Sequence, residues 1–305
     1  RVHFRNNDFD YALVLCGDQL YSMDFGRMVT QHIETFADLT IATIPIDRSA
    51  AQSLGIMQID REQRITRFEE KPKDPAVLDS LRLPPDWYES LRIQGNQELF
   101  LGSMGIYVFN RSILLSLLDN NTMADFGKHI IPTAIQQHRV FSFIFQGYWE
   151  DIGTIRSFFE ANLELTAELP RFNFFDMTAP IYSRPRYLPP SKINGAQLDH
   201  TLVTEGCIIN HANLSHTIVG LRYLVDRGSR LHRTIVMGAD YYESETAIME
   251  SEASGYPRVG IGCNTFIENT IIDKNARIGN GCVITPAGKP ETYDHPTGLY
   301  YIRDG

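Results

Sequence analysis

The chain has 305 residues, of which 43% are apolar, enough to form one large core or two smaller ones. Its formal net charge of -9 argues against a general affinity for nucleic acid or an anionic membrane, because both attract clustered Lys and Arg. The four cysteines form no CxxC pair, which disfavours a zinc site or a disulfide framework. No apolar run approaches the roughly 18 residues of a membrane span, and no leader opens the chain, so we expect a soluble cytoplasmic protein of two domains.

The first strong pattern is the apolar run 11–15, which stops at Gly17 and Asp18. It predicts a strand covered on both faces, as in a parallel sheet between helices. Asp18 would then lie at the strand's carboxyl end, the edge where open α/β sheets bind ligands and where a carboxylate can hold a metal ion against a phosphate. An equally good alternative is an Asp that opens the turn and caps the next helix.

Strand and helix patterns then alternate through the first half of the chain. Apolar residues from Phe25 to Phe36 have helical spacing after Asp24, which could cap that helix, and 39–46 is a β-branched strand. This β-α-β order predicts a parallel pair joined by a right-handed crossover. Further strands are expected at 55–60, 64–68, 101–109 and 140–145, with helices that start at Asp125 and Thr154.

The segment Glu69-Glu70-Lys71-Pro72 is expected on a loop after two short strands. Proline removes a backbone donor and restricts the residue before it, so Lys71 would point in a fixed direction. Its ammonium could neutralise a phosphate, while a neighbouring glutamate accepts hydrogen bonds from sugar hydroxyls. Taken alone, such a triplet is more often a solvated surface turn.

Two further positions could carry chemistry. Ser103 offers a hydroxyl between two glycines that suit the close approach of a ligand, although a structural serine is an equal alternative. Asp151 follows a strand and, with Asp18, would make a site for one hard divalent cation that keeps positions free for phosphate oxygens. The alternative for Asp151 is a helix N-terminal cap.

The second half of the chain has a different spacing of apolar residues. Residues 170–200 are rich in proline and read as a linker between a domain at 1–169 and a domain at 201–305. Beyond the linker an apolar residue recurs about every sixth position, which predicts a hexapeptide β-helix interrupted at 237–258. The expected inward residues are Leu202, Ile208, Leu214, Val219, Val225, Leu231, Val236, Ile261, Ile267, Ile272, Ile278 and Ile284.

Several of these motifs, in this order, resemble those of the glucose-1-phosphate adenylyltransferases, also called ADP-glucose pyrophosphorylases. The resemblance covers nearly the whole chain, and two of the segments, 237–243 and 271–276, look closest to the plant and cyanobacterial branch. It implies an α/β nucleotidyltransferase domain with a Rossmann-like mixed or parallel sheet, followed by a left-handed parallel β-helix. The segments that carry the resemblance are 17–21, 68–72, 103–107, 148–154, 189–192, 237–243 and 271–276.

The resemblance implies transfer of an adenylyl group from ATP to α-D-glucose 1-phosphate, giving ADP-glucose and pyrophosphate for glycogen or starch synthesis. The sugar phosphate would attack the α-phosphorus in line, so the protein mainly aligns two anions and neutralises charge. A homotetramer regulated by anionic metabolites is also implied, in the cytoplasm or in a plastid if the source is a plant. By matching positions, Asp18 and Asp151 would bind Mg²⁺, Lys71 the phosphate, Gly55, Glu70 and Ser103 the sugar, and Arg222 an anionic effector, with Asp18 and Lys71 as the catalytic residues.

One departure limits what the resemblance implies. The Gly-rich, Lys-Pro and TADA-like segments that bind the nucleotide in this family are not present, and the family's last coil is also missing. We therefore expect a fragment or trimmed chain that keeps part of the sugar-phosphate site, rather than a degenerate one, and the choice of adenine rests on the resemblance alone.

Two alternatives of other classes remain. One is a regulatory subunit that senses phosphorylated metabolites. The other is a hexapeptide acyltransferase, which would use a histidine base at a coil edge. The histidines in or beside the coils are His200, His211, His216 and His232.

Overall fold

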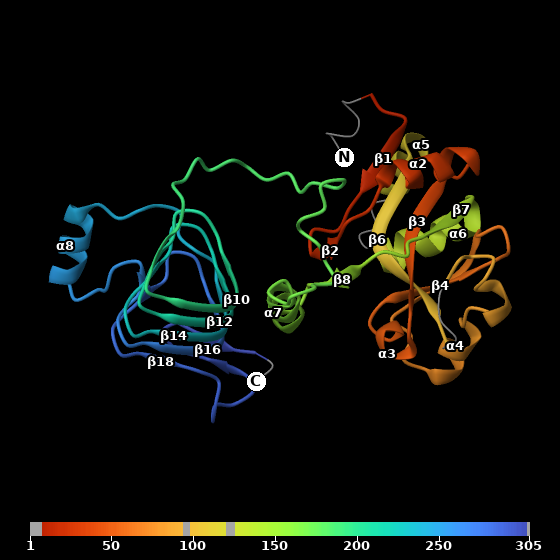
Figure 1. The fold of residues 1–305 in the computed structure, drawn as a ribbon. Helices are drawn as coiled ribbons and strands as arrows, with labels where there is room; N and C mark the ends of the chain where they lie inside the picture. The colour runs from red at the N-terminus through yellow and green to blue at the C-terminus, as the bar shows by residue number, and fades with distance from the viewer. Residues whose placement is uncertain (1–7, 94–97, 120–125, 304–305) are drawn as a thin grey trace. The chain divides into compact units, whose positions relative to one another are not determined.

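The computed structural model describes residues 8–93, 98–119 and 126–303 (Figure 1). Contacts within the chain divide it into two compact units, Arg1–Trp149 and Glu150–Gly305, and each is described by itself. The sequence predicts a first domain that ends at residue 169, whereas these contacts group 150–169 with the second unit. Residue 125, the expected start of one helix, lies outside the described residues. None of the described helices is long and apolar enough to cross a membrane.

The first unit is built on a six-stranded mixed sheet in the order β5-β4-β6-β3-β7, with β1 also paired to β6. Both β1 and β3 are antiparallel to β6. They therefore run parallel to each other, as predicted, but β6 lies between them, so they are not bonded directly as a pair. The parallel neighbour of β3 is β7. The strands are β1 (Tyr11–Val14), β3 (Leu39–Ile46), β4 (Gly55–Ile59), β5 (Ile65–Glu70), β6 (Phe100–Asn110) and β7 (Val140–Ile144), while the short β2 (Gln19–Tyr21) and β8 (Trp149–Asp151) lie outside this sheet.

Aspartates begin three of the helices in this unit. The carboxylates of Asp24, Asp47 and Asp74 accept hydrogen bonds from the backbone amides of the first helical turns, which satisfies donors that have no partner within the helix. The predicted Asp24 cap is confirmed. The helices are α2 (Phe25–Glu34), α3 (Arg48–Ala51), α4 (Pro75–Ser80), α5 (Arg111–Asp119), α6 (Ile131–Gln137), the 3-10 turn η1 (Pro85–Trp87) and the π-turn η2 (Phe126–Ile130).

Alternate residues of β6 supply two separate cores. Ile106 and Val108 pack with Met28 of α2, whereas Tyr107 and Phe109 pack in a second cluster that includes residues of α5 and α6. Successive side chains of a strand point to opposite faces, so a long apolar strand such as β6 requires cover on both. This arrangement confirms the expected α/β class.

The first strand does not have the cover that its apolar sequence predicts. Ala12 is 8% exposed, but Tyr11 and Leu13 are each 40% exposed. The expectation of a strand buried on both faces was therefore wrong for β1, because only its alternate residues face a core within the described structure.

The second unit combines α7 (Ile155–Glu164) with a parallel β-helix. Two five-stranded parallel sheets, β10-β12-β14-β16-β18 and β17-β15-β13-β11-β9, form two of its faces (Figure 1). Both β9 and β10 lie partly or wholly within the predicted linker 170–200. The strands are β9 (Lys192–Asn194), β10 (Gln197–Val203), β11 (Ile208–Asn210), β12 (Asn213–Val219), β13 (Leu224–Val225), β14 (Arg230–Val236), β15 (Gly260–Ile261), β16 (Phe266–Ile272), β17 (Arg277–Ile278) and β18 (Val283–Ile284).

The six-residue repeat located most inward residues of the coils. Leu214, Val219 and Val225 are at most 2% exposed, as expected. Ile208 is a correction, because it is 39% exposed while the next residue, Ile209, is fully buried. Likewise Val203, not Leu202, packs against the coil core.

Two segments do not follow the repeating coils. The chain between β14 and β15 leaves the coils and forms α8 (Glu245–Ala253), which projects from them in Figure 1. After β18 the chain forms a small hairpin of β19 (Tyr293–Asp294) and β20 (Tyr301–Ile302). The expected interruption at 237–258 is therefore confirmed, and it contains a helix.

Candidate functional site

Gly55 and Glu70 meet directly across two antiparallel strands. Gly55 opens β4, Glu70 closes β5, and the two form a cross-strand pair. A Cβ atom added to Gly55 would lie 2.9 Å from Oε2 of Glu70 and 2.5 Å from the ring of Phe68. The absence of a side chain at Gly55 is thus what lets the Glu70 carboxylate occupy this position.

The two glutamates of the EEKP segment are not equivalent. They belong to β5 rather than to the loop that was expected. Glu69 accepts two hydrogen bonds from the guanidinium of Arg67, at 2.8 and 3.1 Å. Glu70 is exposed and, among the described residues, its carboxylate has no hydrogen bond or ion pair. Glu70 is therefore the carboxylate that remains available to a ligand.

Lys71 follows β5 in a left-handed backbone conformation, with φ of 47°. Its amide donates to the carbonyl of Leu54 at 3.1 Å, and Pro72 behind it is buried. The Lys71 ammonium is exposed and forms no ion pair within the described part of the chain. This conformation is uncommon for a non-glycine residue, and here it turns the chain at the end of β5.

Ser103 lies at the same end of these strands. The β4–β6 register pairs Ile56 with Gly102, so Gly55 and Ser103 are the next residues at this end of the two strands. Register on β3 then jumps from Thr43–Ser103 to Ile41–Tyr107, which marks a bulge in β6 after Ser103. The structure therefore brings Gly55, Glu70, Lys71 and Ser103 together at one end of β4 and β5.

The Asp18 turn lies against this bulge. Gln19, the residue after Asp18, donates its side-chain amide to the carbonyl of Met104 at 2.5 Å. Asp18 itself is exposed, with no hydrogen bond to its carboxylate in the described structure. It does not cap the next helix, because Asp24 does so. The alternative in which Asp18 caps the next helix is therefore excluded.

Asp151 is likewise not a helix cap. The cap of α7 is Thr154, whose hydroxyl accepts from the amide of Ser157 in a capping box. Asp151 instead accepts from the amide of Gly153 at 2.8 Å and is exposed. Asp18 and Asp151 belong to different units, so a joint metal site stays a prediction. The described residues contain no group of three or more His, Cys, Asp or Glu that could hold a metal ion. Mg²⁺ does not need such a group, because it is usually bound by one or two carboxylates together with the phosphates of the substrate.

Arg222, the predicted effector residue, lies at a corner of the coils with φ of 59°. Its guanidinium donates to the carbonyl of Ala239 at 3.1 Å. Hydrogen bonds from Lys274 and Asn275, and then the charges of Lys274 and Arg222, lower the pKa of the Asp240 carboxyl. Arg222 thus lies near a second cation, but its guanidinium is partly engaged by the protein itself.

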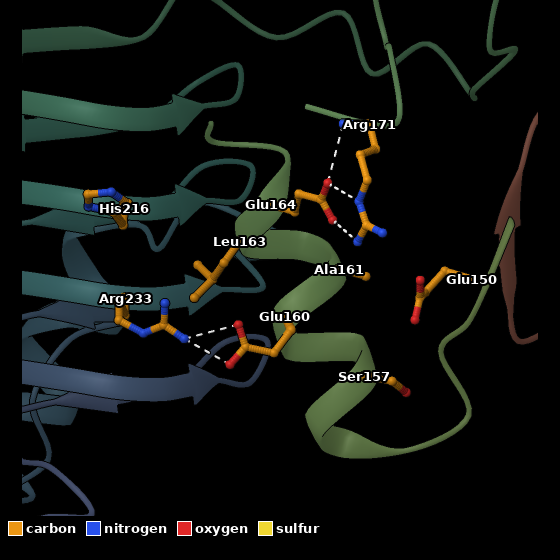
Figure 2. A pocket seen from close by; sticks show the side chains of 9 residues that line it. All are labelled: Glu150, Ser157, Glu160, Ala161, Leu163, Glu164, Arg171, His216 and Arg233. Carbon is orange, nitrogen blue, oxygen red and sulfur yellow. Dashed lines mark hydrogen bonds and ion pairs between the residues drawn. The ribbon is translucent and has the colours of Figure 1, made fainter. Parts of the chain in front are cut away.

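A cavity of about 330 Å³ in the second unit carried no signal in the sequence (Figure 2). Its two arginines are already paired: Arg233 with Glu160 at 2.8 and 3.0 Å, and Arg171 with Glu164 at 2.5 Å. Because their charge is neutralised, this cavity does not present a basic site for a phosphate.

The histidines considered for acyl transfer lie mainly on one sheet of the coils. His200 and His216 stack with ring centroids 4.9 Å apart, and Nδ1 of His232 lies 2.8 Å from the hydroxyl of Ser215. His211 packs beside Gly195, whose added Cβ would lie 2.6 Å from the His211 ring. They are thus stacked on or bonded to neighbouring coils.

The chain thus combines a mixed α/β sheet, in which several candidate site residues lie together, with a domain of parallel coils. Residues 2–168 match the nucleotidyl transferase family, and residues 186–305 match the GLGC left-handed parallel beta-helix domain. The chain belongs to the nucleotidyl transferase family, and its expected fold class, including the left-handed coil, is confirmed.

Among known proteins, the chain is similar to glucose-1-phosphate adenylyltransferase large subunit 1, chloroplastic/amyloplastic, of Zea mays. The two are 40% identical over 305 residues, which cover 99% of this chain and 59% of the maize protein. The similarity confirms the resemblance found in the motifs. The chain spans about three fifths of the length of this relative.

Proposed function

We propose that the protein transfers the adenylyl group of ATP to α-D-glucose 1-phosphate, giving ADP-glucose and pyrophosphate for glycogen or starch synthesis. An oxygen of the sugar phosphate bonds to the α-phosphorus of ATP, and the bond from that phosphorus to the bridging oxygen of the β-phosphate breaks. The observation that carries the proposal is the convergence of Gly55, Glu70, Lys71 and Ser103 beside the Asp18 turn. The similarity to the maize enzyme names the substrates.

The available groups fit the two halves of glucose 1-phosphate. The free Lys71 ammonium meets the phosphate, where a point charge neutralises an anion. The free Glu70 carboxylate accepts hydrogen bonds from sugar hydroxyls, the Ser103 hydroxyl accepts one from them or donates one to them, and Gly55 leaves room for the sugar. Asp18, on the turn beside Ser103, and Asp151 would hold Mg²⁺, which supplies charge neutralisation at the reacting phosphates.

The test is calorimetric titration of glucose 1-phosphate and ADP-glucose in Mg²⁺ against the wild-type protein and Lys71→Ala. Lys73→Ala is the matched control, because Lys73 is an exposed lysine in the same loop. We expect saturable binding that Lys71→Ala weakens by at least about tenfold, the loss of one charge-assisted contact, and that Lys73→Ala preserves. Equal binding by all three proteins, or no binding by folded wild type, would overturn the proposal.

A second candidate function is a regulatory subunit, which the words "large subunit" in the name of the maize relative favour. It predicts binding of anionic metabolites near Arg222, with no turnover of ATP and glucose 1-phosphate by the full-length protein. A plastid location, which the name of the relative suggests, is a further proposal. The homotetramer that the resemblance of the motifs implies is also a proposal.

A further inference from the structure

The bulge in β6 takes residues 104–106 out of register with β3. Between Thr43–Ser103 and Ile41–Tyr107, two steps on β3 correspond to four on β6. Gly105 in the middle of this bulge has φ of 68°. Residues in a bulge lose their ladder partner, and here the side-chain amide of Gln19 fills the place by donating to the carbonyl of Met104 at 2.5 Å.

The turn that precedes Gln19 lies directly on Gly105. A Cβ atom added to Gly105 would be 2.8 Å from Sγ of Cys16 and 3.3 Å from Nε2 of Gln19. The glycine therefore has two roles, because it permits the left-handed backbone and leaves space for the turn. The hydrogen bond and this close packing are separate contacts that hold the turn on the strand.

The contact requires a hydrogen-bond donor at position 19, which the amide of Gln19 supplies. The Met104 carbonyl can only accept, so the partner atom must carry a hydrogen. Oε1 of Gln19 is buried and has no hydrogen-bond partner in the described structure. A glutamate of the same shape would place a carboxylate oxygen against a carbonyl oxygen in a part-buried contact, which is unfavourable.

We propose that Gln19 is a positioning residue that fixes Asp18 relative to Ser103. The two bonded residues, Gln19 and Met104, are the immediate chain neighbours of Asp18 and Ser103. One hydrogen bond thus joins the predicted metal-binding turn to the predicted sugar-binding strand, 85 residues away in sequence. This inference rests on the proposed function.

The consequence is a specific kinetic pattern. Loosening the turn displaces Asp18, while Gly55, Glu70 and Lys71 keep their places on β4 and β5. We therefore expect kcat to fall and the Mg²⁺ concentration for half-maximal rate to rise, with little change in KM for glucose 1-phosphate. A misplacement of about 1 Å at a reacting centre can cost about 100-fold in rate.

The experiment compares Gln19→Glu and Gln19→Met with the control Gln31→Glu in the full-length protein. Gln31 makes the same kind of bond in the same unit, from Nε2 to the carbonyl of Ser142 at 2.8 Å, but away from the Asp18 turn. The measurements are amide hydrogen exchange of residues 16–21, kcat, KM for glucose 1-phosphate and the Mg²⁺ dependence. Gln19→Met removes the donor without adding a charge, in case Gln19→Glu does not fold.

Support requires faster exchange of residues 16–21 and a kcat lowered by about 10- to 100-fold, with a raised Mg²⁺ requirement, in the Gln19 variants only. Unchanged exchange, or the same kinetic change in Gln31→Glu, would overturn the positioning role. Faster exchange with unchanged kinetics would also overturn it. A wild-type protein that neither binds glucose 1-phosphate nor turns it over would instead overturn the proposed function, and the role of Gln19 with it.

Discussion

Gly55 offers a sharp test, because a single added methyl group would collide with two side chains at once. In Gly55→Ala the new Cβ atom would lie 2.5 and 2.6 Å from two ring carbons of Phe68 and 2.9 Å from Oε2 of Glu70. Carbon atoms in contact are normally separated by about 3.5–4.0 Å. The ring must therefore retreat by about 1 Å, and the Glu70 carboxylate by a somewhat smaller distance.

Two separate effects follow. Overpacking of this kind costs about 1–3 kcal/mol, so the thermal midpoint of the first unit should fall by several degrees. If Glu70 accepts a hydrogen bond from the sugar, its displacement removes an interaction with a charged group that is worth about 1.5–3 kcal/mol. Affinity for glucose 1-phosphate should then fall by about 10- to 100-fold.

The assay is calorimetric titration of glucose 1-phosphate in Mg²⁺, beside a thermal scan of the same samples. The double variant Gly55→Ala/Phe68→Leu separates the effects, because a smaller residue at Phe68 relieves the ring contact and leaves the carboxylate contact. We expect it to regain stability but not affinity. The reasoning is refuted if folded Gly55→Ala binds glucose 1-phosphate within about twofold of wild type, less than the loss of even one hydrogen bond.

Two further predictions concern the scaffold of each unit. Burial of His32 lowers the pKa of its imidazole, although the hydrogen bond that its Nε2 donates to Oδ1 of Asn110 opposes this shift. The unfolded chain therefore binds this proton more readily, so the stability of the first unit should be complete above about pH 6.5 and decline as the pH falls toward the lowered pKa. His32→Gln should flatten this pH dependence in denaturant titrations at several pH values. Tyr223→Phe should lower the unfolding free energy of the second unit by about 1–3 kcal/mol in denaturant titrations, because the carbonyl of Ala276 loses a buried donor at 2.9 Å. Tyr242→Phe is the control, because its equivalent bond to Gly206 is near the surface, and it should cost less than about 1 kcal/mol. Equal losses in the two variants would contradict the role of burial.

The sequence alone predicted helix starts and strands correctly where the residues of the element itself determine the structure. Asp24 stands before the first helical spacing and caps α2, and the β-branched run 39–46 forms β3 over those residues. For Asp18 and Asp151 the same signals were ambiguous, because any aspartate near a helix start fits a cap. The structure decides both cases by assigning the caps to Asp24 and Thr154.

The wrong predictions concern contacts with residues that are distant in sequence. An apolar run predicts burial but does not identify the covering element, and β1 has Tyr11 and Leu13 exposed on one face. In the coils, adjacent apolar residues such as Ile208 and Ile209 fit the repeat equally well. A shift of one residue reverses the face of a strand, and the pairing of Ile209 with Val225 of the next coil selects Ile209 as the inward residue.

The EEKP segment shows how strand geometry separates residues that look alike in sequence. Because Glu69 and Glu70 continue β5, their side chains point to opposite faces. Glu69 shares a face with Arg67, two residues earlier, and is bonded by it. Glu70 falls opposite Gly55, where nothing in the described structure bonds it. The strand then ends at once, and the left-handed Lys71 turns the chain at the same edge. Within the described structure, one carboxylate and one ammonium are thus left unpaired side by side in sequence, as the proposed sugar-phosphate site requires.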